Sequence, residues 1–398
     1  MQSQTKNRSR GNGAALETPV TVAVENVTKP APRLVDLAGI ARDALAIRPP
    51  LYAQSIFGPL RSWLPPHRRF SEFGIASIWR PLRTLKFLQN TWLPSLPLSP
   101  PPFNPPFLND LFWQPTVILH RPDHNGSYTS FPEESWFFIN GIMTNDAVAQ
   151  VNAALLSELF HRPVTLIQNS TSSLFVDLLQ CALDKEGWKV SEPVTKAFPV
   201  IYDALKSPHK RRVVVIAHSQ GTIIAAVVLR LLAQITRPAA MDVVPAAAYA
   251  PPEFVYPAQE PLDLSDFAPL TEAELARLEL YCFATCANTM SYVREPAAGQ
   301  RPVPYIEHFG NELDIVARLG MLAPRPARWE IQLQGPRFVR PRAWGHLLNE
   351  HYLYPLADAQ RKGRRRGGRG YAEPFLPFAA TDGIPRLYSY INGGAPSQ

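Results

Sequence analysis

Cysteine and formal charge are scarce in this sequence. Its 398 residues hold three cysteines, Cys181, Cys282 and Cys286, an odd and sparse set that gives no disulfide framework. Cys282 and Cys286 have no second Cys or His pair at zinc-ligand spacing, so we expect no metal. No apolar run follows the polar first ten residues. We therefore expect no signal peptide and a reducing, cytoplasmic location.

Nucleotide and metalloenzyme motifs are missing too. We find no Walker phosphate loop, no Rossmann glycine fingerprint, no HExxH and no CxxC, and we expect no cofactor. The uncharged run 213–229 imitates a transmembrane span, but the polar residues 218–221 interrupt it. A strand, a turn and an apolar helix explain this run better, so no transmembrane helix is predicted.

The basic excess of the chain is local. The formal net charge is +7, and Arg361, Lys362, Arg364, Arg365, Arg366 and Arg369 supply +6 of it. The remainder is nearly neutral, so the basic net charge is a poor argument for a nucleic-acid-binding fold.

Proline is abundant, and its distribution divides the chain. Of 42 prolines, 19 lie in residues 1–135, 4 in residues 136–235 and 19 in residues 236–398. Because proline is excluded from central strands and helix interiors, the proline-poor hundred residues should form the regular part of the fold. Seven prolines within 94–106 indicate an extended spacer.

Strand and helix patterns alternate through the proline-poor region. Apolar or β-branched runs predict strands at 136–140, 163–168 and 212–217, and helical spacing predicts helices at 148–159, 174–183, 194–205 and 221–232. Further strands are expected at 278–284, 303–309 and 329–333, with a leading hairpin of 117–120 and 127–129. This alternation predicts an α/β fold with a mostly parallel sheet covered by helices on both faces.

We expect five segments along the chain. They are a disordered tail (1–30), a Pro/aromatic-rich accessory region (31–114), an α/β core (115–358), an Arg/Gly-rich loop (359–370) and a C-terminal segment (371–398). Within the core, 242–269 is Pro- and Ala-rich and is interpreted as an insertion.

The sharpest chemical signal is the sequence Ala217-His218-Ser219-Gln220-Gly221, between the strand at 212–217 and the helix that follows it. A serine on such a tight turn projects its hydroxyl away from the sheet. The positions two before and two after it must be small, and they are Ala217 and Gly221. The alternative is an ordinary strand–helix turn with a polar cap.

With this turn the chain resembles the α/β-hydrolase superfamily over about residues 115–355, although Ala217 replaces the usual first glycine. The family's chain order is Ser, Asp or Glu, then His. The resemblance implies a triad of Ser219, Asp314 and His346. Glu312 is the alternative carboxylate, and Asp314 could be a helix N-cap only. His351 and His308 are the alternative bases.

The resemblance also implies an oxyanion hole built from backbone N–H groups. One donor should be Gln220, directly after the nucleophile, and the other Ile142 or Gly141 in the loop after the strand at 136–140. His218 is expected to have a structural or pocket-lining role.

These residues predict a serine hydrolase that cleaves a carboxylic ester, such as a lipid ester, through an acyl-enzyme. The alternative is a catalytically idle scaffold on the same fold. Residues 71–93 show the spacing of a basic amphipathic helix, for which a membrane surface is the weaker interpretation and packing on the core the stronger. Arg364–Gly370 could contact RNA or another acidic partner, although a solvated loop is the simpler interpretation.

Overall fold

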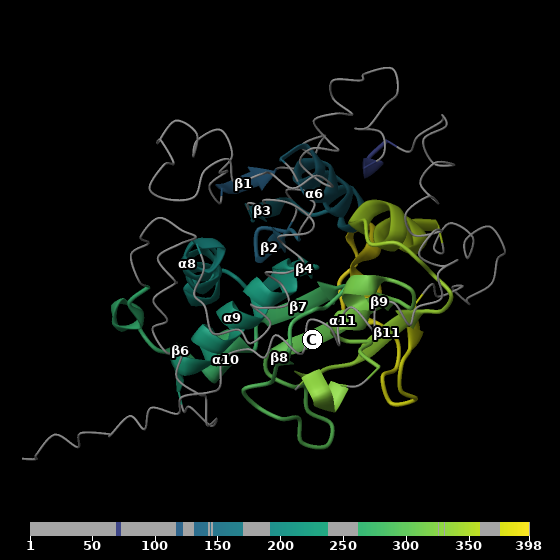
Figure 1. Ribbon diagram of the computed structural model, residues 1–398. Coiled ribbons are helices and arrows are strands. Elements are labelled where there is room, and N and C mark those ends of the chain that lie inside the picture. The colour runs from purple at the N-terminus through teal and green to yellow at the C-terminus, as the bar shows by residue number, and fades with distance from the viewer. Residues whose placement is uncertain are drawn as a thin grey trace, which may run out of the picture.

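A computed structural model (Figure 1) describes residues 69–72, 117–121, 131–141, 144, 146–169, 192–237, 262–324, 326–329, 331–358 and 375–397. The predicted helix at 174–183, the strand at 127–129, the Arg/Gly-rich loop and nearly all of 71–93 lie outside these residues. Among the described helices, none combines the length and hydrophobicity needed to cross a membrane.

An eight-stranded sheet forms the centre of the fold, in the order β1-β3-β2-β4-β7-β9-β11-β12. Six neighbouring strands are parallel, and β1 and β12 join the two edges antiparallel. The bounds are β1 Val117–Arg121, β2 Glu134–Ile139, β3 Val164–Gln168, β4 Arg212–His218, β7 Leu278–Phe283, β9 Tyr305–Asn311, β11 Arg337–Arg340 and β12 Leu376–Pro377. The predicted mostly parallel α/β sheet is therefore confirmed, and this arrangement fits an α/β-hydrolase-like fold.

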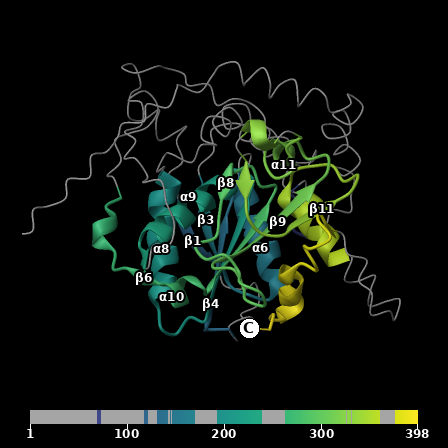
Figure 2. The same ribbon diagram turned by 90° about the horizontal axis from the view of Figure 1, so that it is seen from below.

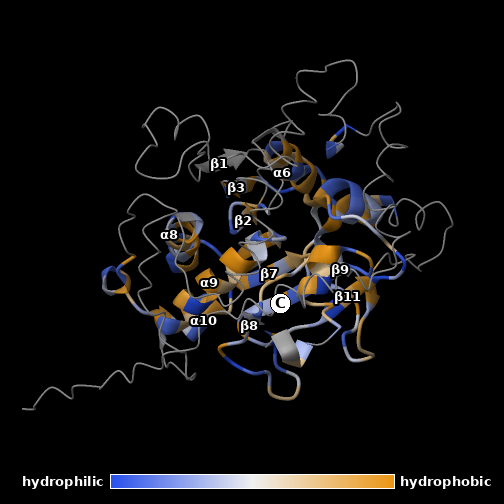
Figure 3. Ribbon diagram, in the orientation of Figure 1, coloured by the Kyte–Doolittle hydropathy of each residue, from blue (hydrophilic) through white to orange (hydrophobic). Residues whose placement is uncertain are grey.

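Helices cover the sheet on two sides (Figure 2). On one side lie α8 (Glu192–Lys206) and α9 (Gly221–Gln234), which pack against each other. On the other lie α6 (Asp146–Phe160), the π-helix η4 (Leu348–Leu353) and the 3-10 helix η5 (Arg386–Gly393). In Figure 3 α9 is mostly hydrophobic, as a helix buried between sheet and neighbouring helix must be.

The remaining helices and strands are short. They are β5 (Thr236–Arg237), η2 (Leu264–Asp266), β6 (Leu270–Thr271), α10 (Glu272–Leu275), β8 (Thr289–Met290), α11 (Ile315–Leu319), η3 (Pro326–Trp329) and β10 (Gln332–Leu333).

The prediction of a strand at 329–333 is wrong for most of its length. Pro326–Trp329 forms the 3-10 helix η3, and only Gln332–Leu333 is extended, paired with β8 in a separate two-stranded sheet. The main sheet instead gains β11, which pairs parallel with β9. β11 is short and flanked by Gly335 and Pro341, so no run of apolar residues marks it. At the opposite edge of the sheet, β1 pairs with β3 in antiparallel register.

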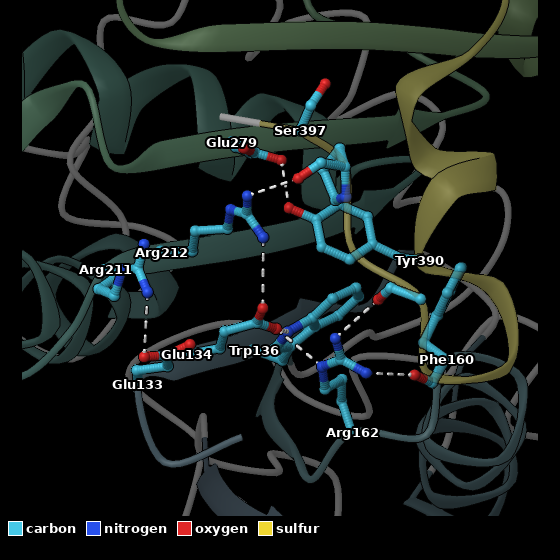
Figure 4. Close-up of polar contacts among 12 residues, drawn as sticks. Glu133, Glu134, Trp136, Phe160, Arg162, Arg211, Arg212, Glu279, Tyr390 and Ser397 are labelled. Carbon is cyan, nitrogen blue, oxygen red and sulfur yellow. Dashed lines mark hydrogen bonds and ion pairs between the residues drawn. The ribbon is translucent and has the colours of Figure 1, made fainter. Parts of the chain in front are cut away.

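A polar cluster lies at the amino-terminal ends of the central strands (Figure 4). Glu134, the first residue of β2, pairs with the fully buried Arg162 at 2.7 Å. Arg162 also donates to the carbonyl oxygens of Phe160 and Gly394, at 3.0 and 2.8 Å. The C-terminal segment thereby becomes part of the core, because its backbone satisfies a buried guanidinium.

Two neighbouring glutamates offer a matched test of this cluster. Glu134→Gln leaves Arg162 buried without its counter-charge, and we expect it to lower the free energy of unfolding by about 3 kcal/mol. Glu133→Gln removes only the exposed pair with Arg211, and should cost about 0.5 kcal/mol or less. Urea denaturation measures both values, and equal losses would contradict the assignment.

Candidate active site

Ser219 lies in a strained turn between β4 and α9. Its φ of 57° belongs to the left-handed region, which costs about 1–2 kcal/mol for a non-glycine residue. Its carbonyl oxygen accepts hydrogen bonds from the Thr222 N–H at 2.9 Å, the Thr222 hydroxyl at 2.7 Å and the Cys286 thiol at 3.3 Å. Its N–H donates to the Phe283 carbonyl oxygen at 2.9 Å. These bonds hold the serine in its unusual conformation.

Two glycines allow the backbone to pass close to this turn. A Cβ at Gly221 would lie 2.3 Å from the carbonyl oxygen of Ile139 at the end of β2. A Cβ at Gly141 would lie 2.3 Å from the Cβ of Ser219 and 3.0 Å from its Oγ. Any side chain at either position would collide with backbone or with Ser219. The small residue expected two positions after Ser219 is therefore required by the end of the neighbouring strand.

A chain of hydrogen bonds joins the three residues of the predicted triad. The Oγ of Ser219 lies 2.9 Å from Nε2 of His346, and Nδ1 of His346 lies 2.8 Å from Oδ2 of Asp314. An ionised carboxylate only accepts, so Nδ1 carries the proton and Nε2 is left as the acceptor facing the serine hydroxyl. The residues come from the end of β4, the loop before α11 and the loop before η4.

The Asp314 carboxylate is buried and shared among several donors. Besides His346, it accepts the Tyr352 hydroxyl at 2.6 Å and the Val316 N–H at 2.9 Å. Burial raises the pKa of Asp314, but the imidazole of His346 and these hydrogen bonds outweigh burial and hold that pKa below its ordinary value. Asp314 is also the N-cap of α11, so the capping role and the contact with His346 coexist.

Burial and Asp314 have opposite effects on the pKa of His346. Burial lowers its pKa, but the charge and hydrogen bond of Asp314 outweigh burial and raise the pKa above its ordinary value. His218 steadies the same loop, since its Nε2 lies 2.9 Å from the carbonyl oxygen of His346. Burial lowers the pKa of His218 to about 3, so its ring is neutral at physiological pH and acts as a hydrogen-bond donor there.

The alternative carboxylate and bases lie elsewhere. Glu312 accepts the Arg342 N–H at 2.6 Å, and so braces the loop after β11. Nδ1 of His351 accepts the Leu347 N–H at 2.9 Å. His308 lies within β9, between the Thr285 hydroxyl and the Gln334 carbonyl oxygen, at 2.9 and 3.0 Å. None of these four hydrogen bonds is with Ser219 or His346.

Two of the expected oxyanion donors, Gln220 and Gly141, lie at the carboxyl ends of β4 and β2. Gln220 is the N-cap of α9, where backbone N–H groups have no partner within the helix. Gly141 lies against Ser219, whereas Ile142 is outside the described residues. A polar relay joins these loops: the Asn169 amide donates to Oε1 of Gln220 at 2.7 Å, and the Asn169 N–H donates to Oδ1 of Asn140 at 2.6 Å.

Several site residues were not predicted from the sequence. Tyr352 binds Asp314, Thr222 and Cys286 bind the Ser219 carbonyl oxygen, and Asn311 donates to the Gly345 carbonyl oxygen at 3.1 Å. The role of Thr222, directly after Gly221, could have been inferred from the sequence, because a threonine hydroxyl can reach back to a carbonyl in the preceding turn. The others act across more than 30 residues of chain, which no local pattern reveals.

Comparison with known proteins adds little. No protein-family model matches the chain, and no curated protein matches it. Among solved structures, the chain is similar to a hyperthermophilic esterase from the archaeon Pyrobaculum calidifontis, with a TM-score of 0.31 and 8% identity, covering 81% of this chain and 93% of that one. A likeness this low establishes no activity for this chain.

The crowding at Gly221 can be tested by stability. Gly221→Ala places a Cβ against the Ile139 carbonyl oxygen, which cannot swing away, and we expect a loss of about 3 kcal/mol in the free energy of unfolding. Gly299→Ala is the control, because that glycine has a positive φ but nothing within 4 Å, so only backbone strain of about 1 kcal/mol should appear. Similar melting curves for the two variants would contradict the crowding argument.

Proposed function

We propose that this protein is a serine hydrolase of the α/β-hydrolase type that cleaves a carboxylic ester. The observation that carries the proposal is the continuous path from Ser219 through His346 to Asp314, with contacts of 2.9 and 2.8 Å. A serine next to a ring nitrogen is common, but one in a left-handed turn with its base held by a buried carboxylate is the arrangement of an activated nucleophile.

In this mechanism the Oγ of Ser219 attacks the ester carbonyl carbon while Nε2 of His346 takes its proton. The C–O bond to the alcohol then breaks, and His346 returns the proton to the leaving oxygen. Water attacks the acyl-enzyme by the same route, with His346 again as base, and releases the acid. Asp314 orients the imidazole and stabilises its charged form throughout.

The negative charge that develops on the carbonyl oxygen needs donors that are already in position. We assign the N–H of Gln220 to this role together with the N–H of Gly141 or Ile142. Removing one such donor typically costs about 10²–10³ in turnover. The Asn140–Asn169–Gln220 relay supports this assignment, because it fixes the two loops relative to each other.

A fluorophosphonate probe tests the proposal directly, since it labels only an activated serine. The full chain should be labelled, Ser219→Ala should not, and Ser265→Ala, which removes an exposed serine far from the turn in sequence, should be labelled like the wild type. Absence of labelling in the folded wild-type protein would favour the idle scaffold.

The identity of the base can be tested with two matched substitutions. His346→Asn removes the base, and we expect labelling to slow by several orders of magnitude, since triad members act as a unit. In His351→Asn the amide oxygen can still accept the Leu347 N–H, so labelling should stay within about tenfold of wild type. If His351→Asn were the slower variant, the base would have to be reassigned.

The pH dependence of labelling reports the Asp314–His346 pair. The base must be neutral, so labelling falls as pH drops through the pKa of His346, which Asp314 holds above its ordinary value. Asp314→Asn removes the charge that raises this pKa, and the acidic limb should therefore move to lower pH. The plateau rate should drop by about 10⁴-fold, as expected when the orienting carboxylate is lost. A limb that does not move would contradict the pairing.

A further inference from the structure

A four-residue segment from far upstream is built into the core beside His346. Residues 69–72 are the described part of the first 116 residues, drawn in purple in Figure 1. Phe70, Ser71 and Glu72 are buried, and Glu72 is 0% exposed. A fully buried carboxylate is rare unless its charge is used or compensated.

Both oxygens of the Glu72 carboxylate accept backbone hydrogen bonds. Oε1 accepts the Asn349 N–H at 3.0 Å, and Oε2 accepts the Glu350 N–H at 3.1 Å. These amides lie in the first turn of η4, three and four residues after His346. Each oxygen of the Glu72 side chain thus accepts one backbone N–H of η4.

The same segment is tied to its surroundings through its backbone. The Asn349 side-chain amide donates to the Phe70 carbonyl oxygen at 2.8 Å and to the Val151 carbonyl oxygen of α6 at 3.1 Å. The Phe70 N–H donates to the Tyr354 hydroxyl at 3.0 Å. Segment 69–72 therefore joins α6 to the start and the end of η4.

We propose that Glu72 is a positioning residue for His346, holding the start of η4 so that the imidazole stays between Ser219 and Asp314. This inference rests on the proposed function. It gives part of the accessory region a definite role. Without Glu72, two N–H groups in the first turn of η4 lose their acceptor, and the loop that carries His346 loosens. The same buried segment contains the first two residues of the 71–93 stretch, which makes packing on the core their role.

Burial raises the pKa of Glu72 to about 8, although the N–H groups of Asn349 and Glu350 and the nearby His346 lower it. Burial therefore favours the protonated form near neutral pH, and Glu72 acts on η4 through its two hydrogen-bond acceptors rather than through its charge.

The test is the hydrolysis of p-nitrophenyl butyrate by the full chain, with active sites counted by burst titration so that unfolded protein does not count. For Glu72→Gln, which keeps one acceptor oxygen, we expect kcat per active site to fall about tenfold, and for Glu72→Ala about a hundredfold, the scale of a catalytic group displaced by about 1 Å. KM should change less than twofold, because the Glu72 side chain is fully buried. The control is Glu350→Gln, which changes a partly exposed carboxylate in η4 itself. This variant should keep kcat within twofold.

Each outcome decides one question. If wild type turns over and the Glu72 variants match it per active site, Glu72 is merely structural and the inference is overturned; the same holds if KM rises while kcat stays constant. If the Glu72 variants do not fold, Tyr354→Phe loosens the Phe70 anchor instead, and an unchanged kcat there would overturn it. A wild-type protein that neither hydrolyses the ester nor reacts with fluorophosphonate refutes the proposed function itself.

Discussion

The close approach of two backbones at the carboxyl ends of β2 and β4 constrains the whole site. Ser219 is in the left-handed conformation, α9 starts two residues later, and Gly221 there meets the Ile139 carbonyl oxygen. This contact requires β2 and β4 to be neighbours in parallel register, with Ile139 opposite Ala217. The same register brings Gly141 against Ser219. One steric fit thus ties the β2–β4 pairing to the turn at Ser219 and to the loop at Gly141.

A second constraint is the buried charge of Asp314. A carboxylate removed from water must find donors, and here they come from three separate segments: Val316 in α11, His346 in its loop and Tyr352 in η4. Tyr352 also accepts the Asn311 N–H at 3.2 Å, which ties η4 to the end of β9. The π-helical winding of η4 is consistent with this demand, since irregular turns of this kind often occur at functional sites. The hydrogen bonds to this one buried carboxylate therefore fix α11, the His346 loop and η4 relative to one another.

The sequence was informative where structure is local. The β-branched strand, the polar turn and the apolar helix around Ser219 lie within about twenty residues, and their pattern predicted β4 and α9 closely. Asp314 and His346 followed from chain order, and the structure brings both to Ser219. What the sequence could not reveal depends on contacts between distant segments. β11 is four residues long and is defined by pairing with β9, and Glu72 meets Asn349 across 277 residues. Periodicity within a window carries no information on such contacts.

The amino and carboxyl ends of the sheet each hold a buried carboxylate, and the side chain paired with it determines what the pair can do. At the amino end, burial raises the pKa of Glu279, but Arg301 and Arg386 outweigh burial and lower it, and both partners are permanent cations. The charges there are fixed, and removal of Glu279 would leave two arginines without their carboxylate, which gives the pair a structural role. At the carboxyl end the partner of Asp314 is an imidazole, which gains and loses a proton near neutral pH. A histidine, unlike an arginine, can change its protonation in such a pair, and the Asp314 carboxylate favours the protonated ring. A pair able to change its protonation therefore lies at the carboxyl end of the sheet, where His346 contacts the buried Ser219.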